Sequence, residues 1–182
     1  MFKYFPTNYV WNLSVDLAIE MGARIGEIEE MCAPLQEAAK APDAAGTQAF
    51  RETWVRMADK LCALADEDKL RGRLLSAGEK LGRAASYLIT AERLQAHGSP
   101  GRVALYQRVL ELFAEGARLA GDNCERVEIP YEGKQLSALY VRAEGVQGAA
   151  PVLIPALGYL LLKRRSSIED SAAFMGTLRA NT

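Results

Sequence analysis

The spacing of the hydrophobic residues changes once along this chain, near Gly121, and this change constrains the fold more than any other feature. From Trp11 to Ala120 the apolar residues recur every three or four positions, as on one face of an α-helix. After Gly121, Val127 and Ile129 alternate with charged residues, as in a strand with one buried face. The sequence therefore predicts an α+β protein, with a helical bundle over residues 1–122 and strands after it.

Five amphipathic helices are expected in the bundle, each defined by one apolar stripe. The first two stripes are Trp11, Val15 and Ala18, and, after the break from Gly22 to Gly26, Ile28, Met31, Cys32 and Leu35. The third is Phe50, Trp54, Met57, Ala58, Leu61, Leu64 and Ala65, with Arg51, Arg56, Lys60, Glu67 and Asp68 mostly outside it. The fourth is Leu74, Ala77, Leu81, Ala84, Ala85, Leu88 and Ala91, and the fifth is Val103, Tyr106, Val109, Leu110, Phe113 and Ala117.

The segment His97–Pro100 separates the fourth helix from the fifth. Gly98 can adopt the left-handed conformation that ends a helix. Ser99 is then expected to cap the fifth helix and Pro100 to occupy its first position, while Gly121 ends that helix.

Three strands are expected in the second part of the chain. The first contains Val127 and Ile129, and the second is the apolar run from Leu136 to Val141. Tyr131–Lys134 between them is typical of a hairpin turn. Pro151–Ile154 is entirely apolar and predicts a strand buried on both faces. We therefore divide the chain into a helical domain over 1–122, opening strands over 123–155, and a tail over 156–182.

Composition and charge exclude several classes of protein. The net charge is -1, from 22 basic and 23 acidic residues, so neither nucleic acid nor an anionic membrane is expected as a partner. The longest apolar run, Pro155–Leu162, is far shorter than the roughly 18 residues that span a bilayer, and we expect a cytoplasmic location. Cys32, Cys62 and Cys124 lack the close spacing of metal ligands, so neither a metal nor a cofactor is expected.

The order of several short features resembles one branch of the α/β-hydrolase family. These features are Gly22 and Gly26-Glu27, Trp54, Ser76-Ala77, Arg83-Ala84 and Tyr87, Tyr106 and Phe113, Val127–Gly133 with Leu136, and Pro151–Ile154. The branch includes the 2,6-dihydropseudooxynicotine hydrolases, the fungal pigment-pathway polyketide-shortening hydrolases and the fermentation-respiration switch proteins. The likeness covers about Tyr4 to Ile154.

This resemblance implies a helical lid over an active site, followed by the hairpin and first parallel strand of a hydrolase sheet. The implied reaction is attack by a serine on the carbonyl group of a substrate. It leads to hydrolysis of a C–C bond beside a ketone, or of an ester or amide bond. The serine would sit in a G-x-S-x-G elbow, with Asp and His later in the chain.

None of these catalytic groups can be assigned in this sequence. Ser76 has Gly78 after it but Leu74 before it, Ser99 lacks both flanking glycines, and the sole histidine, His97, is expected to be solvated at the end of a helix. We name no catalytic residue. We expect a truncated or frame-shifted hydrolase front end that is inactive alone, with a partner chain supplying the catalytic half.

Four aromatic residues are candidates for a substrate pocket: Trp54, Tyr87, Tyr106 and Phe113. Their helical spacing is more typical of core residues, because an apolar stripe usually packs inward. Gly158 is the candidate for the glycine of an oxyanion loop, and the position of Glu27 in a first helical turn is explained by the helix dipole. The alternative function is a helical interaction module that forms oligomers or completes a partner hydrolase.

Overall fold

The structure is a computed structural model that describes residues 3–40 and 47–145. It confirms the α+β class, because five α-helices precede a two-stranded antiparallel sheet. The chain divides into two compact units, one ending at Gly121 and the other beginning at Asp122. The predicted strand Pro151–Ile154, the tail 156–182 and Gly158 lie outside the described residues.

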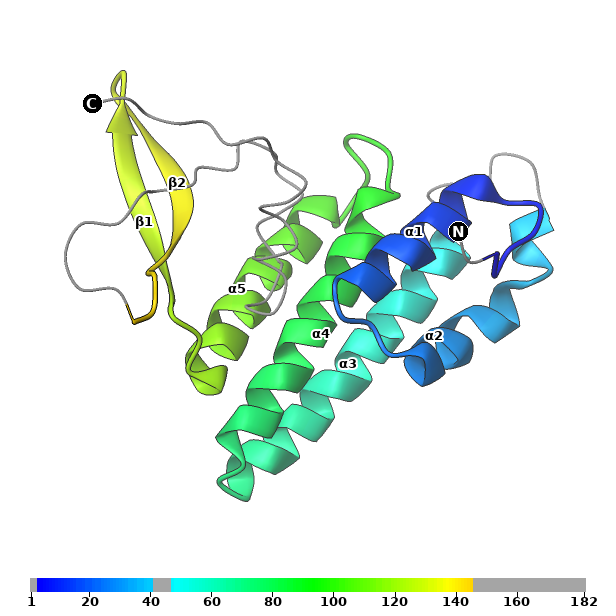
Figure 1. The fold of residues 1–182 in the computed structure, drawn as a ribbon. Helices are drawn as coiled ribbons and strands as arrows, with labels where there is room; N and C mark the ends of the chain where they lie inside the picture. Colours follow the sequence, from blue (N-terminus) through cyan, green and yellow to red (C-terminus); the bar gives the residue numbers. More distant parts are fainter. Residues whose placement is uncertain (1–2, 41–46, 146–182) are drawn as a thin grey trace. The chain divides into compact units, whose positions relative to one another are not determined.

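The first unit is built on three long helices, α3 (Gln48–Leu70), α4 (Leu74–Arg93) and α5 (Arg102–Ala120). They lie side by side with α4 in the middle (Figure 1). The shorter α1 (Tyr9–Glu20) contacts α4, and α2 (Ile25–Cys32) contacts α3. Two short 3-10 helices, Ala33–Leu35 and Ala38–Lys40, follow α2.

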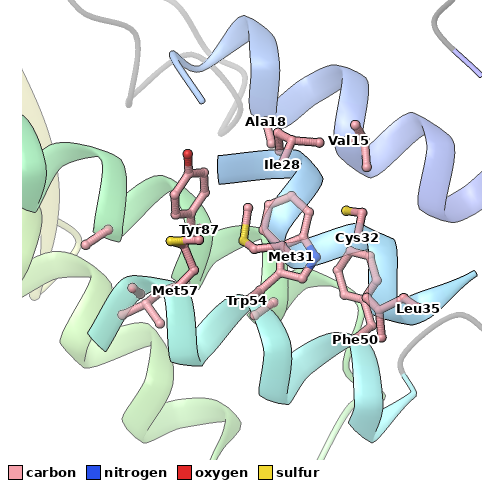
Figure 2. Packing of buried hydrophobic residues seen from close by; sticks show 14 of the residues in the cluster. Val15, Ala18, Ile28, Met31, Cys32, Leu35, Phe50, Trp54, Met57 and Tyr87 are labelled. Carbon is pink, nitrogen blue, oxygen red and sulfur yellow. The ribbon is translucent and has the colours of Figure 1, made fainter. Parts of the chain in front are cut away.

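The main core lies where α1 and α2 cover α3 and α4. Its largest fully buried side chains include Trp11. Figure 2 shows five more of them, Ile28, Met31, Phe50, Trp54 and Tyr87. Burial of each of these large apolar side chains stabilises the unit by roughly 1.5–3 kcal/mol, before the loss of chain entropy is counted. The stripes predicted for the first two helices are confirmed.

Glycines bring α4 and α5 into backbone contact. A Cβ atom on Gly78 would lie 2.6 Å from the Ala120 nitrogen and 2.7 Å from the Gly116 oxygen. A Cβ atom on Gly116 would lie 3.0 Å from the Gly82 nitrogen. Only glycine therefore permits this approach of the two helices.

The face of α5 that packs inward was predicted wrongly. Its buried residues are Leu105, Val109 and Gly116, whereas Val103 is 74% exposed and Tyr106 44%. The apolar arc of α5 is wider than one neighbour can cover, and α4 takes only one side of it. Leu64 and Leu74 were also predicted on buried stripes, those of the third and fourth helices, and both are exposed at the edges of these stripes.

The predicted start of α5 and the predicted exposure of Asp68 are also wrong. Gly101, in the left-handed conformation with φ 76°, precedes α5, so Ser99 does not cap the helix and Pro100 is not its first residue. Asp68 is buried near the end of α3 because α4 supplies partners for its carboxylate. Gly98 has the expected left-handed conformation, and Gly121 ends α5 as predicted.

The second unit contains the hairpin of β1 (Cys124–Tyr131) and β2 (Lys134–Val141). Tyr131 pairs with Lys134 across a two-residue turn, and the register continues without interruption to Cys124 and Val141. Both turn residues have positive φ, 46° at Glu132 and 74° at Gly133, as a type I′ turn requires. The hairpin predicted from the sequence is confirmed.

The two faces of the hairpin differ, because one carries mainly apolar side chains and the other a mixture of polar and apolar ones. Val127, Ile129 and Tyr131 share a face with Leu136, Ala138 and Tyr140, and four of these side chains are more than a third exposed. On the other face, Arg126 donates hydrogen bonds to Glu128 and Ser137 at 2.7 Å each, and Ser137 donates to Glu128 at 2.9 Å. The bonds that Glu128 accepts from Arg126 and then Ser137 lower its pKa. A two-stranded hairpin with an uncovered apolar face is marginally stable by itself.

Candidate functional site

Two of the four aromatic pocket candidates lie in the core. Trp54 and Tyr87 are fully buried, with ring centroids 5.7 Å apart, and Phe50 stacks on Trp54 at 5.0 Å (Figure 2). The Trp54 Nε1 donor is buried and has no hydrogen-bond partner among the described residues. The structure therefore places these two rings in packing positions within the core.

The other two candidates, Tyr106 and Phe113, lie on α5 away from its buried face. With Val103, Leu110 and Ala117 they form a stripe at alternating spacings of three and four residues, which we call the outer stripe. Phe113 is half-buried and touches the edge of the core, while Tyr106 is exposed. The structure brings Tyr106 and Phe113 to one surface and separates them from Trp54 and Tyr87.

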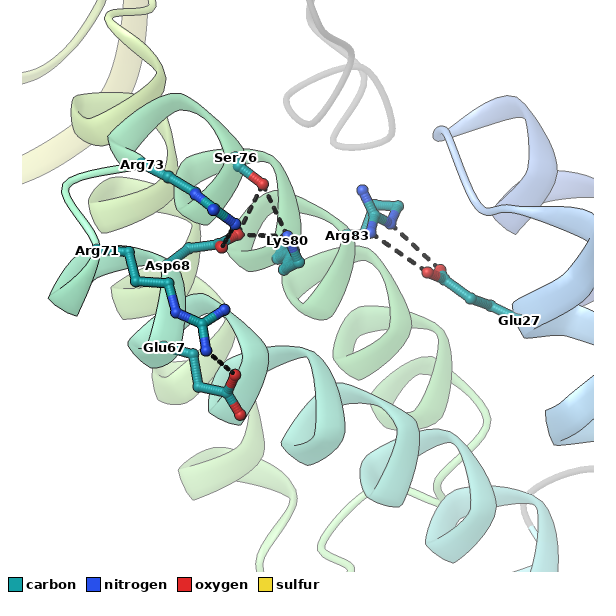
Figure 3. Close-up of polar contacts among 8 residues, drawn as sticks. All are labelled: Glu27, Glu67, Asp68, Arg71, Arg73, Ser76, Lys80 and Arg83. Atoms are coloured by element: carbon teal, nitrogen blue, oxygen red, sulfur yellow. Dashed lines mark hydrogen bonds and ion pairs between the residues drawn. The ribbon is translucent and has the colours of Figure 1, made fainter.

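A polar cluster joins α2 to α4. The Glu27 carboxylate accepts hydrogen bonds from Arg83 Nε and Nη2 at 3.2 and 3.3 Å and from the Tyr87 hydroxyl (Figure 3 shows the Arg83 pair). The Arg24 backbone N–H donates to the Tyr87 hydroxyl at 3.3 Å. Burial, and then the bond to Glu27, raise the pKa of Tyr87 well above its usual range, so the phenol stays neutral.

This cluster is suited to hold helices together rather than to transfer protons. The Glu27 carboxylate is neutralised by Arg83, and its side chain is 19% exposed. The sequence explained Glu27 by the helix dipole alone and missed two partners 56 and 60 positions away. The resemblance named all three residues, but only as separate members of a longer series, and it did not indicate their contact.

A second polar cluster places a serine beside an acid and a lysine. Ser76 Oγ donates to Asp68 Oδ2 at 2.7 Å, and Lys80 Nζ donates to Ser76 Oγ at 2.8 Å and also to Asp68 (Figure 3). The bonds from Lys80 and then Ser76 lower the pKa of Asp68. Lys80 Nζ donates to both Ser76 Oγ and the Asp68 carboxylate, and a nitrogen that donates to the serine oxygen is not placed to take its proton.

The sole histidine is remote from Ser76. Ser76 lies in the first turn of α4, whereas His97 follows the end of that helix and is exposed. Ser76 and Arg93, which ends α4, are 17 positions apart and are therefore separated by about 25 Å of helix. His97 Nδ1 lies 3.5 Å from Arg102 Nη1, and no hydrogen bond among the described residues joins His97 to Ser76 or Ser99. Within the part of the chain that the structure describes, the groups of a serine triad are not assembled.

The three cysteines are free, and Cys32 is buried. Burial, and then the nearby Glu29 carboxylate, raise the pKa of Cys32 to about 12, which makes its thiol unreactive. Among residues 3–40 and 47–145, no group of three His, Cys, Asp or Glu could hold a metal ion. A shallow hollow of about 220 Å³ lies at the open end of the hairpin, lined by Asp122, Asn123, Cys124, Glu125, Tyr140 and Arg142, and it contains none of the aromatic candidates.

The two edges of the hairpin differ in chemistry. The pair that flanks a two-residue turn exchanges both backbone hydrogen bonds, and the bonded pairs then alternate along the ladder. The outward N–H groups of β2 therefore belong to Gln135, Ser137, Leu139 and Val141. The outward positions of β1 are Cys124, Arg126, Glu128 and Pro130.

Only the β1 edge carries the features that prevent further pairing. Pro130 has no N–H at its outward position. The outward residues Arg126 and Glu128 are charged, although their head groups reach across the ladder to Ser137 of β2. The β2 edge has four neutral residues with all their outward N–H groups present. A further strand can therefore add to β2 much more easily than to β1.

No family model matches the chain, and no curated protein is found to match it. None of the described helices is long and apolar enough to cross a membrane.

Proposed function

We propose that this chain is the front part of an α/β-hydrolase, with the helical unit as a lid and the hairpin as the opening of the catalytic sheet. The observation that carries the proposal is the asymmetry of the hairpin, protected along β1 and open along β2. A hairpin of this kind is suited to be the edge of a larger sheet that grows from β2.

The outer stripe of α5 supports the same proposal. A lid must present a surface to the catalytic domain and to an apolar carbonyl substrate. Tyr106 and Val103 are exposed on this stripe, although a bundle that was complete by itself would bury them. The pocket candidates are thereby reduced to Tyr106 and Phe113. A cytoplasmic location is part of the proposal, and three free cysteines support it.

Serine-hydrolase chemistry is not proposed for the described residues alone. Lys80 is not placed to act as a base for Ser76, and the described part of the chain offers no second histidine to supply one. The nucleophile elbow, the acid and the base must come from a catalytic fragment.

The proposal is tested by complementation. The chain is purified alone and with an α/β-hydrolase fragment that lacks its lid and opening hairpin, and hydrolysis of a p-nitrophenyl ester is measured. We expect turnover only from the mixture, and expect Leu139→Pro, which removes an outward N–H of β2, to abolish the gain. Glu128→Pro on the β1 edge is the matched control and keeps it. Turnover by the chain alone would contradict the proposal.

A second candidate function is a non-catalytic interaction module. The observation that favours it is that two surfaces have no partner among the described residues: the exposed part of the outer stripe of α5, and the outer edge of β2. A stable oligomer with no turnover in either sample would support this function over the first.

A further inference from the structure

The open edge of β2 is complementary to a second copy of itself. In an antiparallel pairing about Ala138, the outward residues Ser137 and Leu139 of one copy would face Leu139 and Ser137 of the other, and Gln135 would face Val141. This register uses all four outward N–H groups of each strand. No proline interrupts it.

The side chains in this register are also compatible. Ala138 would meet Ala138 at the centre, where the backbones come closest, and Leu136 would meet Tyr140, a favourable aliphatic and aromatic pair. From Gln135 to Val141 the strand has no charged residue, so no like charges oppose each other. The apolar faces of the two hairpins would become one continuous face.

We infer that, in the absence of catalytic strands, β2 pairs with β2 of a second copy to form a four-stranded antiparallel sheet. The inference rests on the second candidate function and names its partner and its surface. It places the main contact on the β2 edge, whose outward N–H groups are not paired by β1, rather than on the outer stripe of α5.

Disulfide trapping tests the register. In the proposed pairing the two Ala138 residues form a pair without mutual hydrogen bonds, at a Cα separation of about 4.5 Å, within the range that a disulfide spans. Ala138→Cys is therefore expected to give a disulfide-linked dimer on mild oxidation. Val127→Cys is the matched control, because Val127 is the half-buried neighbour of Ala138 on the same apolar face but lies on β1.

We expect Ala138→Cys to cross-link roughly tenfold or more faster than Val127→Cys or the native chain, because pairing raises the local thiol concentration. Adding Leu139→Pro should remove this difference, since the hairpin itself tolerates proline at an outward position, as Pro130 shows. Equal cross-linking of the two cysteine variants, or a dimer in light scattering that Leu139→Pro leaves intact, would overturn the inference. These outcomes leave the complementation test unaffected, because that test measures turnover.

Discussion

Tyr87 illustrates, at the scale of the residue, how a buried polar atom is satisfied. Its ring packs on Trp54, while its hydroxyl donates to Glu27 and accepts from the Arg24 N–H. Removing one partner of a buried bond to a charged group costs about 1.5–3 kcal/mol. Tyr87→Phe is therefore expected to lower the free energy of unfolding by that amount in urea titrations. Tyr106→Phe, at an exposed position of α5, should change it by less than about 0.5 kcal/mol. Equal effects of the two variants on the free energy of unfolding would show that the hydrogen bonds of the Tyr87 hydroxyl do not stabilise the fold.

Asp68 gives the stability a defined dependence on pH. Its pKa is lower in the folded protein than in the unfolded chain, because Lys80 and Ser76 donate to the carboxylate. Its contribution is therefore present above the unfolded pKa, near 4, and is lost as the pH falls through the lower folded value. We expect the Tm to fall between about pH 5 and pH 3, and to fall less steeply in Asp68→Asn. Asp66→Asn, at a largely exposed neighbour, should keep the native slope. An unchanged slope in Asp68→Asn would show that other carboxylates dominate.

Single residues were the hardest features to predict from the sequence. Helical spacing placed Trp54 and Tyr87 on buried faces, but it could not distinguish core from pocket, because both environments select aromatic residues. The partners of Asp68 were missed because Ser76 and Lys80 belong to another helix, and their distance in space depends on the turn at Gly72. The oxyanion candidate Gly158 lies outside the described residues.

At the scale of the element, the glycines of α4 and α5 set the distance between the helices. Gly78→Ala would place a methyl group within 2.6–2.7 Å of α5 backbone atoms, and overpacking of this kind costs about 1–3 kcal/mol. We expect Gly78→Ala to lower the Tm measured by circular dichroism. Gly26→Ala is the matched control of opposite sign, since its Cβ would meet nothing within 4 Å and alanine favours the helix by up to about 1 kcal/mol. A Gly78→Ala variant as stable as the native chain would show that the helices separate without cost.

The helices and the hairpin could be predicted because their signals are local. Periodicity located all five helices, and the Glu132-Gly133 turn fixed the strand register. The buried side of α5 could not be predicted, since Val103, Leu105, Tyr106 and Val109 are all apolar and only the position of α4 selects among them. The helix α5 begins at Arg102, after the left-handed Gly101, rather than directly after Ser99. The sequence could not predict this start, because Gly98 and Gly101 are equally suited to precede a helix.

At the scale of the whole molecule, the surfaces of the two units say most about what the chain does. The helical unit buries a full core and still exposes Val103 and Tyr106 of the outer stripe of α5, and among the described residues one face and one edge of the hairpin have no partner within its sheet. Both surfaces are expected of a protein that functions in a larger assembly. The resemblance to α/β-hydrolases suggests which assembly, and it stays a proposal.

Hydrogen exchange of the β2 amides, followed by NMR, tests most directly whether the sheet grows from β2. The chain is studied below the concentration at which it self-associates, with and without the catalytic fragment. We predict that the outward amides of Gln135, Ser137, Leu139 and Val141 exchange rapidly alone and become protected when the fragment is added. The amides of Leu136, Ala138 and Tyr140 should be protected by β1 in both samples. The contradicting result is a mixture that hydrolyses the ester while the outward amides exchange as rapidly as in the chain alone. In that case the sheet does not grow from β2.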